Sequence, residues 1–325
     1  MQTDETKALR EIGRHLDACS FGTLQVHRGG IVVPSGSTLI PQFLGTENRN
    51  ERKRSRRSPA GARPWTFGRP RPSGGAWASS GGSWATCPAT SVVGRAHGAL
   101  YAEALDEIEQ AYPGTRDWHQ QDALWLIVPA ALLPGGLLRA KFVARIPNDE
   151  DLVRAWGFWD GGAVGASWIG PRHTNFPDGT ICAFERQDGT WNLGDPLLDL
   201  FDLYTVWGIR HLHLRCFGRW PGPQAVADPY ERILEFNDDE LCGCGAVNAR
   251  YSECCRDRDQ RCLGVSLAMG YTGRMMGGLR HPPAVVTQFI REQRQPPTSS
   301  ELFAAQAGPK SSVPSIERAD ADAMP

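Results

Sequence analysis

The stretch from Leu197 to Leu214 constrains the fold of this chain more than any other segment. Its apolar residues surround nearly the whole cylinder of a helix, so protein must cover that helix on most sides. Asp195-Pro196 provides a favourable helix start, and Gly218 can take the left-handed conformation that ends a helix. We therefore predict a central, buried helix that ends at about Phe217.

The segments before this helix predict an antiparallel sheet. They are joined by Pro134-Gly135-Gly136, Pro147-Asn148-Asp149 and Asp160-Gly161-Gly162, which have the turn chemistry of neighbouring antiparallel strands. A helix from about Gly98 to Tyr112 precedes them, because its apolar residues recur at helical spacing and Pro113-Gly114 stops it. A helix, a four-stranded antiparallel meander and a central helix make an α+β domain. The expected strands are 123–128, 138–146, 152–159 and 163–169.

A cysteine lies between the expected sheet and the central helix, in a distinctive setting. Cys182 follows His173-Thr174-Asn175 and the turn Pro177-Asp178-Gly179, and Trp191 comes after it. Taken alone, this cysteine would be a small buried hydrophobe, which is the usual fate of a free cysteine. The turn can instead present Cys182 in an extended, partly open conformation, as a sulfur nucleophile on a rigid frame requires.

These residues resemble the active-site region of ubiquitin-conjugating (E2) enzymes. The resemblance covers roughly residues 97–222 and is closest to the stand-alone E2-like proteins of bacterial antiphage cyclic-nucleotide signalling operons (type II CBASS). It implies a UBC-like (E2) fold and a thioester on Cys182. It also implies that Asn175 hydrogen-bonds the oxyanion or shapes the loop, and that His173 is mainly structural. Thr174 departs from the family's His-Pro-Asn tripeptide, which removes a φ constraint but leaves both functional side chains in place.

The same resemblance implies partners. An E1-like activating enzyme would supply a ubiquitin-like modifier, or the acyl group would come from the carboxyl terminus of a CBASS nucleotidyltransferase (CD-NTase). A protein substrate would accept that group on an amine. The predicted activity is therefore that of an E2-like conjugating transferase with Cys182, Asn175 and His173 at its site.

Four of the nine cysteines are tightly clustered, at Cys242, Cys244, Cys254 and Cys255. A tight Cys-x-Cys turn and an adjacent Cys-Cys pair can satisfy tetrahedral zinc, which prefers sulfur at structural sites. This segment resembles the SEC-C motif, although its intervening segment is one residue longer than the usual form. Four thiolates leave no open coordination position, so we predict structural Zn²⁺. Chance clustering and redox-active cysteines are the alternatives.

Composition divides the rest of the chain. The segment around the basic run 52–57 is rich in Arg, Pro, Gly and Ser and cannot bury enough surface to offset the entropy lost on ordering. The predicted organisation is a weakly ordered N-terminal segment (1–45), a disordered basic linker (46–92), an E2-like domain (93–228), a SEC-C-like zinc-binding module (229–262) and a C-terminal segment with a polar tail (263–325).

Charge and hydropathy limit the kinds of function that we expect for this chain. The net charge of −1 argues against a global attraction to nucleic acid or membranes. No apolar run reaches the length of about eighteen residues that a membrane span needs without a charge or a proline. The start, Met1 to Arg14, is charged and polar, so we expect a reduced, cytoplasmic protein.

Two other functions stay open. In the first, the E2 fold and the zinc knuckle only bind proteins, as a non-catalytic adaptor. In the second, the basic linker binds nucleic acid, with strongly salt-dependent affinity and interleaved tryptophans that would stack on bases.

Overall fold

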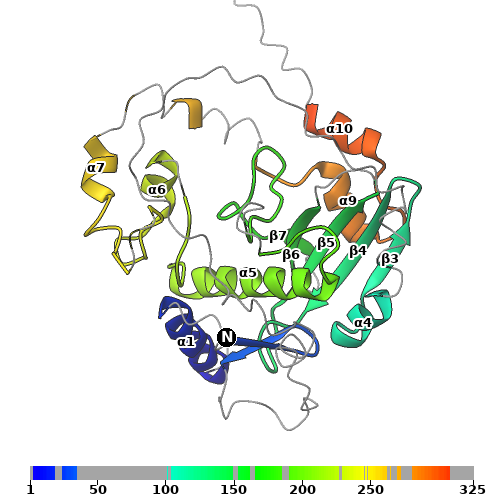
Figure 1. Ribbon diagram of the computed structural model, residues 1–325, viewed down its shortest axis with the longest axis horizontal. Helices are drawn as coiled ribbons and strands as arrows, with labels where there is room; N and C mark the ends of the chain where they lie inside the picture. Colours follow the sequence, from blue (N-terminus) through cyan, green and yellow to red (C-terminus); the bar gives the residue numbers. More distant parts are fainter. Residues whose placement is uncertain are drawn as a thin grey trace, which may run out of the picture.

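The computed structural model has an α+β fold built around a five-stranded antiparallel sheet (Figure 1). The linker 46–92 and Cys19, Cys87 and Cys262 lie outside the residues it describes. Those residues are 3–18, 24–34, 101, 104–148, 153–161, 165–184, 190–226, 229–244, 246, 248–261, 264, 269–271 and 280–307.

The sheet is a single meander, in which every strand pairs with its neighbour in the sequence. Its longest ladder joins β4 to β5, from the Ala123–Pro147 pair to the Ala130–Ala140 pair. The predicted α+β class is confirmed, and β4 to β7 overlap the four predicted strands. β3 was not predicted, because Arg-Asp-Trp-His shows no apolar alternation. The strands are β3 (Arg116–His119), β4 (Ala123–Ala130), β5 (Arg139–Pro147), β6 (Arg154–Asp160) and β7 (Ala166–Trp168).

The long helix α5 (Leu197–Phe217) packs on one face of the sheet and is buried along most of its length, as predicted. Gly218 ends it in the left-handed conformation, with φ of 70°, and donates its N–H to the carbonyl of Leu214. Pro196 takes the cap position, whereas Asp195 accepts a hydrogen bond from the amide of Asn192 and does not cap the helix. Helix and sheet approach closely, since a Cβ on Gly157 would lie 2.6 Å from the Trp207 ring.

The N-terminal segment differs from its prediction. Residues 1–45 were expected to be weakly ordered, yet α1 (Thr3–Asp17) buries Leu9, Ile12 and Leu16 in the core around α5. The helix is short of apolar residues, but the ones it has form a single stripe. Arg219 also binds the carboxylate of Asp17 through two hydrogen bonds, at 2.7 and 3.0 Å. A hairpin of β1 (Leu24–His27) and β2 (Ile31–Pro34) and the helix α4 (Ala104–Ala111) complete this side.

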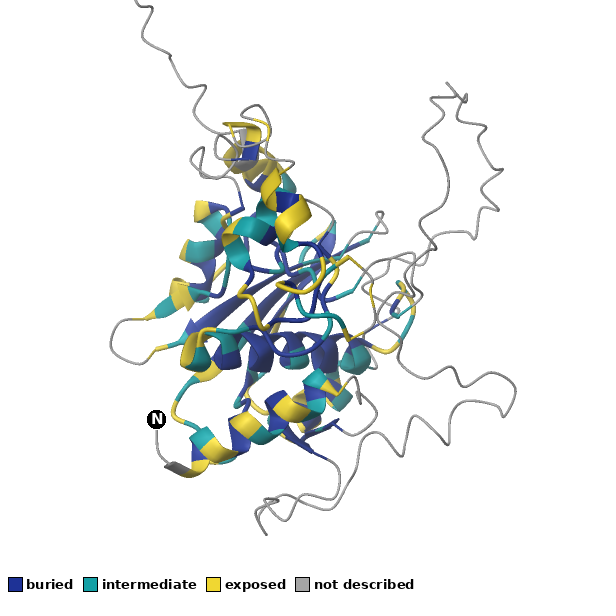
Figure 2. Cartoon of the chain, turned by 90° about the vertical axis from the view of Figure 1, so that its left-hand side faces the viewer, coloured by how far each residue is buried: buried dark blue, intermediate teal, exposed yellow. Residues whose placement is uncertain are grey.

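The opposite face of the sheet is covered by the C-terminal helices α9 (Ala284–Glu292) and α10 (Ser299–Ala307), so buried residues lie on both sides of it (Figures 1 and 2). Trp125 stacks on Trp156 at 6.2 Å between ring centroids and meets Phe289 edge-on. α10 replaces part of the expected polar tail, because Leu302 is buried in this second core.

The cysteine-rich part of the chain contains two short helices, α6 (Pro229–Glu235) and α7 (Arg256–Arg261). This part has a small core of its own, made of Val226, Phe236, Tyr251 and two cysteines. Among the described residues, no helix combines the length and the apolar character needed to cross a membrane.

Candidate active site and metal centre

The loop that carries Cys182 doubles back on itself beside the sheet. Thr174 and Ile181 form an isolated antiparallel bridge, and the backbone N–H of Cys182 donates to the carbonyl of His173 at 3.0 Å. Ile181 also donates its N–H to the carbonyl of Ala155 in β6, at 2.7 Å. The loop therefore continues the hydrogen bonding of the sheet, which gives Cys182 a fixed backbone.

The structure brings Asn175 and Cys182 to the same part of this loop. Cys182 is partly exposed, and Asn175 is exposed. The Asn175 amide donates from Nδ2 to the hydroxyl of Thr180 and to the carbonyl of Ile181, both at 3.3 Å. Both N–H groups of the Asn175 amide thus bond within the loop that carries Cys182.

His173 is held from several directions. Its backbone has a left-handed φ of 49°, and its carbonyl also accepts the indole N–H of Trp207 at 2.9 Å. Its ring packs on Trp220 at 4.2 Å, and its Nε2 lies 3.1 Å from Oε1 of Gln224. Burial, and then the positive charge of Arg172, hold the pKa of His173 well below its usual value. A neutral, immobilised imidazole is suited to shaping the loop.

Thr174 is also engaged at the position where the resemblance expects proline. Its hydroxyl donates to the carbonyl of Pro171, and its own carbonyl accepts Nε of Arg280 at 3.1 Å. The Arg280 guanidinium lies 4.7 Å from the Phe176 ring, and its backbone N–H donates to the carbonyl of Pro177 at 2.5 Å. Hydrogen bonds therefore restrain the loop where a proline ring is missing.

A buried ion pair joins this loop to the cysteine-rich segment. Both carboxylate oxygens of Glu240 accept hydrogen bonds from Arg172, and neither side chain is more than 5% exposed. Glu240 also accepts the backbone N–H of Trp220 at 2.7 Å and an amide N–H of Gln224 at 3.2 Å. Sequence reasoning missed this network, because nothing in a single sequence pairs two charges so far apart.

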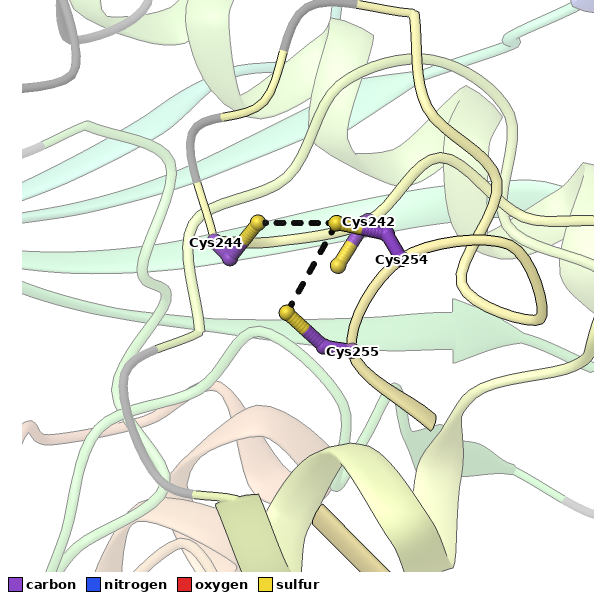
Figure 3. A group of neighbouring side chains, drawn as sticks. All are labelled: Cys242, Cys244, Cys254 and Cys255. Atoms are coloured by element: carbon purple, nitrogen blue, oxygen red, sulfur yellow. Dashed lines mark hydrogen bonds between the residues drawn. The ribbon is translucent and has the colours of Figure 1, made fainter. Parts of the chain in front are cut away.

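The four clustered cysteines point toward one another (Figure 3). All four sulfurs lie within 4.8 Å of one another, with Cys254 3.4 Å from Cys244 and 3.7 Å from Cys255. Zinc–sulfur bonds of about 2.3 Å in a tetrahedron place the sulfurs about 3.8 Å apart. The cluster can therefore hold a metal ion, and its geometry and donor chemistry are compatible with zinc.

The surrounding residues support this cluster. The N–H of Cys242 donates to the carbonyl of Ala249 at 2.8 Å, in a hairpin-like turn. The guanidinium of Arg232 binds both carboxylate oxygens of Asp259, at 2.7 and 2.8 Å, and this pair is buried. Burial raises the pKa of the Cys242 thiol, so metal binding there would release a proton.

Trp191, the tryptophan that follows Cys182 in the sequence, has a structural role. It is buried and donates its indole N–H to the carbonyl of Pro196 at 3.1 Å, which ties the segment after Cys182 to the start of α5.

Comparison with known proteins finds no matching family model, no matching curated sequence and no matching solved structure.

Proposed function

We propose that this protein is an E2-like acyltransferase with a UBC-type catalytic domain, in which Cys182 carries the acyl group. The observation that carries the proposal is the placement of a partly exposed Cys182 on a hydrogen-bonded loop, with the Asn175 amide directed at the preceding peptide group. A thioester carrier needs these features: an accessible sulfur, a rigid frame and a hydrogen-bond donor close by.

The reaction would proceed in two steps. The Cys182 thiolate attacks the acyl carbon of an incoming thioester, a new carbon–sulfur bond forms, and the donor leaves as its own thiolate. An amine of the protein substrate then attacks the Cys182 thioester, and the amide forms as the Cys182 thiolate leaves. The proton of the amine passes to a base or to water. No oxidant or reductant is required.

Each step passes through a tetrahedral centre with negative charge on oxygen, which a fixed donor stabilises. We assign that role to Asn175, whose amide would exchange its hydrogen bond to the Ile181 carbonyl for one to the oxyanion. His173 would act as a positioning residue, because its carbonyl, and not its ring, bonds the backbone of Cys182.

The partners follow from the resemblance to the CBASS group. We propose an E1-like enzyme as donor, with a ubiquitin-like modifier or a CD-NTase carboxyl terminus as the acyl group. Zn²⁺ would be held by the four cysteines in a structural role, since four thiolates complete a tetrahedron. When bound, the ion supplies rigidity to its module and takes no part in the transfer.

The test uses the full chain and a peptide with a carboxyl-terminal thioester of a small thiol, followed by a CBASS-type E1-like enzyme and its ubiquitin-like modifier. We expect an adduct on Cys182 that dithiothreitol removes. Cys182→Ser should give an adduct that resists dithiothreitol, because its ester is an oxygen ester. Cys216→Ala, which removes an exposed cysteine of α5, is the matched control and should still form the adduct.

An adduct that persists in Cys182→Ala would overturn the proposal. Binding of the E1-like enzyme or modifier with no adduct in the wild-type protein would support the adaptor function instead. Affinity for nucleic acid that disappears on deletion of residues 46–88 would support the nucleic-acid function.

A further inference from the structure

The structure connects the cysteine cluster to the Cys182 loop through a short series of buried contacts. Glu240 stands two positions before Cys242 in the sequence, and Arg172 immediately precedes His173. The side chains of Glu240 and Arg172 meet in the interior, where Arg172 also lies over the rings of Trp220 and Phe236.

Gln224 provides a parallel connection. Its amide oxygen accepts from Arg172 at 2.8 Å and lies 3.1 Å from the His173 ring. Its amide nitrogen donates to Glu240 at 3.2 Å and to the carbonyl of Leu241 at 3.0 Å. The backbone beside the cluster is thereby bonded to both residues that begin the loop.

The buried charges make this connection stiff. A carboxylate or guanidinium that loses its partner inside a protein is strongly destabilising, so Glu240 and Arg172 must move together or remain in place together. The carbonyl of His173 in turn accepts the N–H of Cys182 at 3.0 Å. A displacement of Glu240 is therefore passed through two residues to the backbone of the proposed nucleophile.

Beyond the buried Arg232–Asp259 pair, the cluster segment has little apolar packing to hold it together. Its core consists of Val226, Phe236, Cys242, Tyr251 and Cys255, and its helices are short. Cores of this size rarely stabilise a structure alone, and metal binding supplies folding free energy in such modules. Loss of the metal should loosen the segment that carries Glu240.

We propose that Glu240 is a positioning residue through which metal bound at the four cysteines fixes the Cys182 loop. With metal, the Arg172–Glu240 pair holds the loop in the conformation seen here. Without metal, Glu240 shifts, the loop opens and the Cys182 thiol becomes more accessible. The functional meaning of this coupling rests on the proposed role of Cys182, but its physical test does not.

The experiment measures the rate at which iodoacetamide alkylates Cys182 in the full chain, read by mass spectrometry of its peptide. Protein saturated with Zn²⁺ is compared with protein stripped by a chelator. We expect alkylation about tenfold faster after stripping, a change within the range of coupled sites. Cys216 provides an internal control, since it belongs to α5 and its alkylation rate should change little.

The variant Glu240→Gln separates coupling from metal binding. Co²⁺ bound by the four thiolates should keep its charge-transfer bands, while Cys182 is alkylated quickly whether or not metal is present. Asp238→Asn is the matched control, because it removes an exposed carboxylate of the same segment, paired with Arg256, that does not contact the loop. With metal saturating the cluster, Cys182 in this variant should be alkylated at the wild-type rate.

Equal alkylation of Cys182 in the metal-saturated and stripped wild-type protein would overturn the proposal, and this comparison requires no variant to fold. Slow alkylation of Glu240→Gln with metal bound would overturn it as well. Alkylation requires no E1-like enzyme or modifier, so failure of this coupling is distinguishable from failure of the transferase proposal.

Discussion

The carbonyl of His173 accepts two hydrogen bonds, from the backbone of Cys182 at 3.0 Å and from the indole of Trp207 at 2.9 Å. One bond comes from the loop that carries Cys182 and the other from the middle of α5. The buried helix α5 therefore fixes the point at which the loop turns back on itself.

Asn175→Ala should slow acyl transfer and leave the fold intact. Loss of one donor to an oxyanion typically lowers a rate by about 100- to 1,000-fold. Because Asn175 is exposed but makes two hydrogen bonds within the loop, its removal should lower the free energy of unfolding by only about 1–2 kcal/mol. Single-turnover transfer and urea unfolding measure the two effects. Asn192→Ala, at another exposed asparagine, is the control and should transfer at the wild-type rate; equal rates in both variants would contradict the role of Asn175.

Arg172→Ala should destabilise the protein strongly. It leaves the fully buried carboxylate of Glu240 without its charged partner, which typically costs about 3–5 kcal/mol. Arg256→Ala removes half of the exposed pair with Asp238, where the cost should be below about 1 kcal/mol. Denaturant unfolding of both variants measures the two losses in free energy of unfolding. Similar losses would show that burial of the Arg172–Glu240 pair does not determine the size of the loss.

The protein should bind one zinc ion per chain through the cysteine cluster. Cys255→Ser should abolish binding, because three thiolates and a hydroxyl suit zinc poorly. A chelator should lower the thermal unfolding temperature of the wild-type protein and have little effect on the variant. Metal analysis by mass spectrometry and calorimetry checks both points. Cys216→Ser should retain the ion, and a metal content equal in the two serine variants would exclude the site.

His211 should contribute to acid sensitivity. Burial lowers its pKa from 6.5 to about 3, so between these values the unfolded chain binds a proton that the folded protein does not. Stability must then fall as pH is lowered through this window, by at most about 1.4 kcal/mol per pH unit from this group. His211→Gln should show a smaller dependence than the wild-type protein in urea unfolding between pH 7 and pH 4. An unchanged pH dependence of stability in His211→Gln would contradict this contribution of His211.

Helix α10 should be part of the stable fold. Leu302→Ala empties a buried position against the sheet and should cost about 2–5 kcal/mol, as such truncations do. Phe303→Ala, at the exposed neighbouring position, should cost less than about 1 kcal/mol. Equal effects on the urea midpoint would mean that α10 does not pack as described.

The elements that sequence reasoning predicted are those with strong local signals. The all-round apolar pattern and Gly218 define α5, and the glycine-rich turns separate β4 to β7. The cysteine spacing likewise predicts a cluster whose sulfurs do converge. These features depend on residues that are close together in the chain.

The features that were missed depend on distant partners. α10 buries Leu302 through a sequence with little apolar periodicity, and β3 is a polar edge strand. Arg172 and Glu240 are 68 positions apart, so only the folded structure brings them together. For the same reason, sequence reasoning underestimated the contribution of α1 to the core. The apolar stripe of α1 is buried only because it packs in the same core as α5.

The second core has a consequence for the order of folding during synthesis. One wall of it, with Trp125 and Trp156, is complete once β6 has been made, whereas the helices that cover it follow more than a hundred residues later. A growing chain on the ribosome would therefore display a broad aromatic surface for a long interval. Such a surface invites self-association and chaperone binding, so production in cells should depend on how quickly translation reaches α9 and α10.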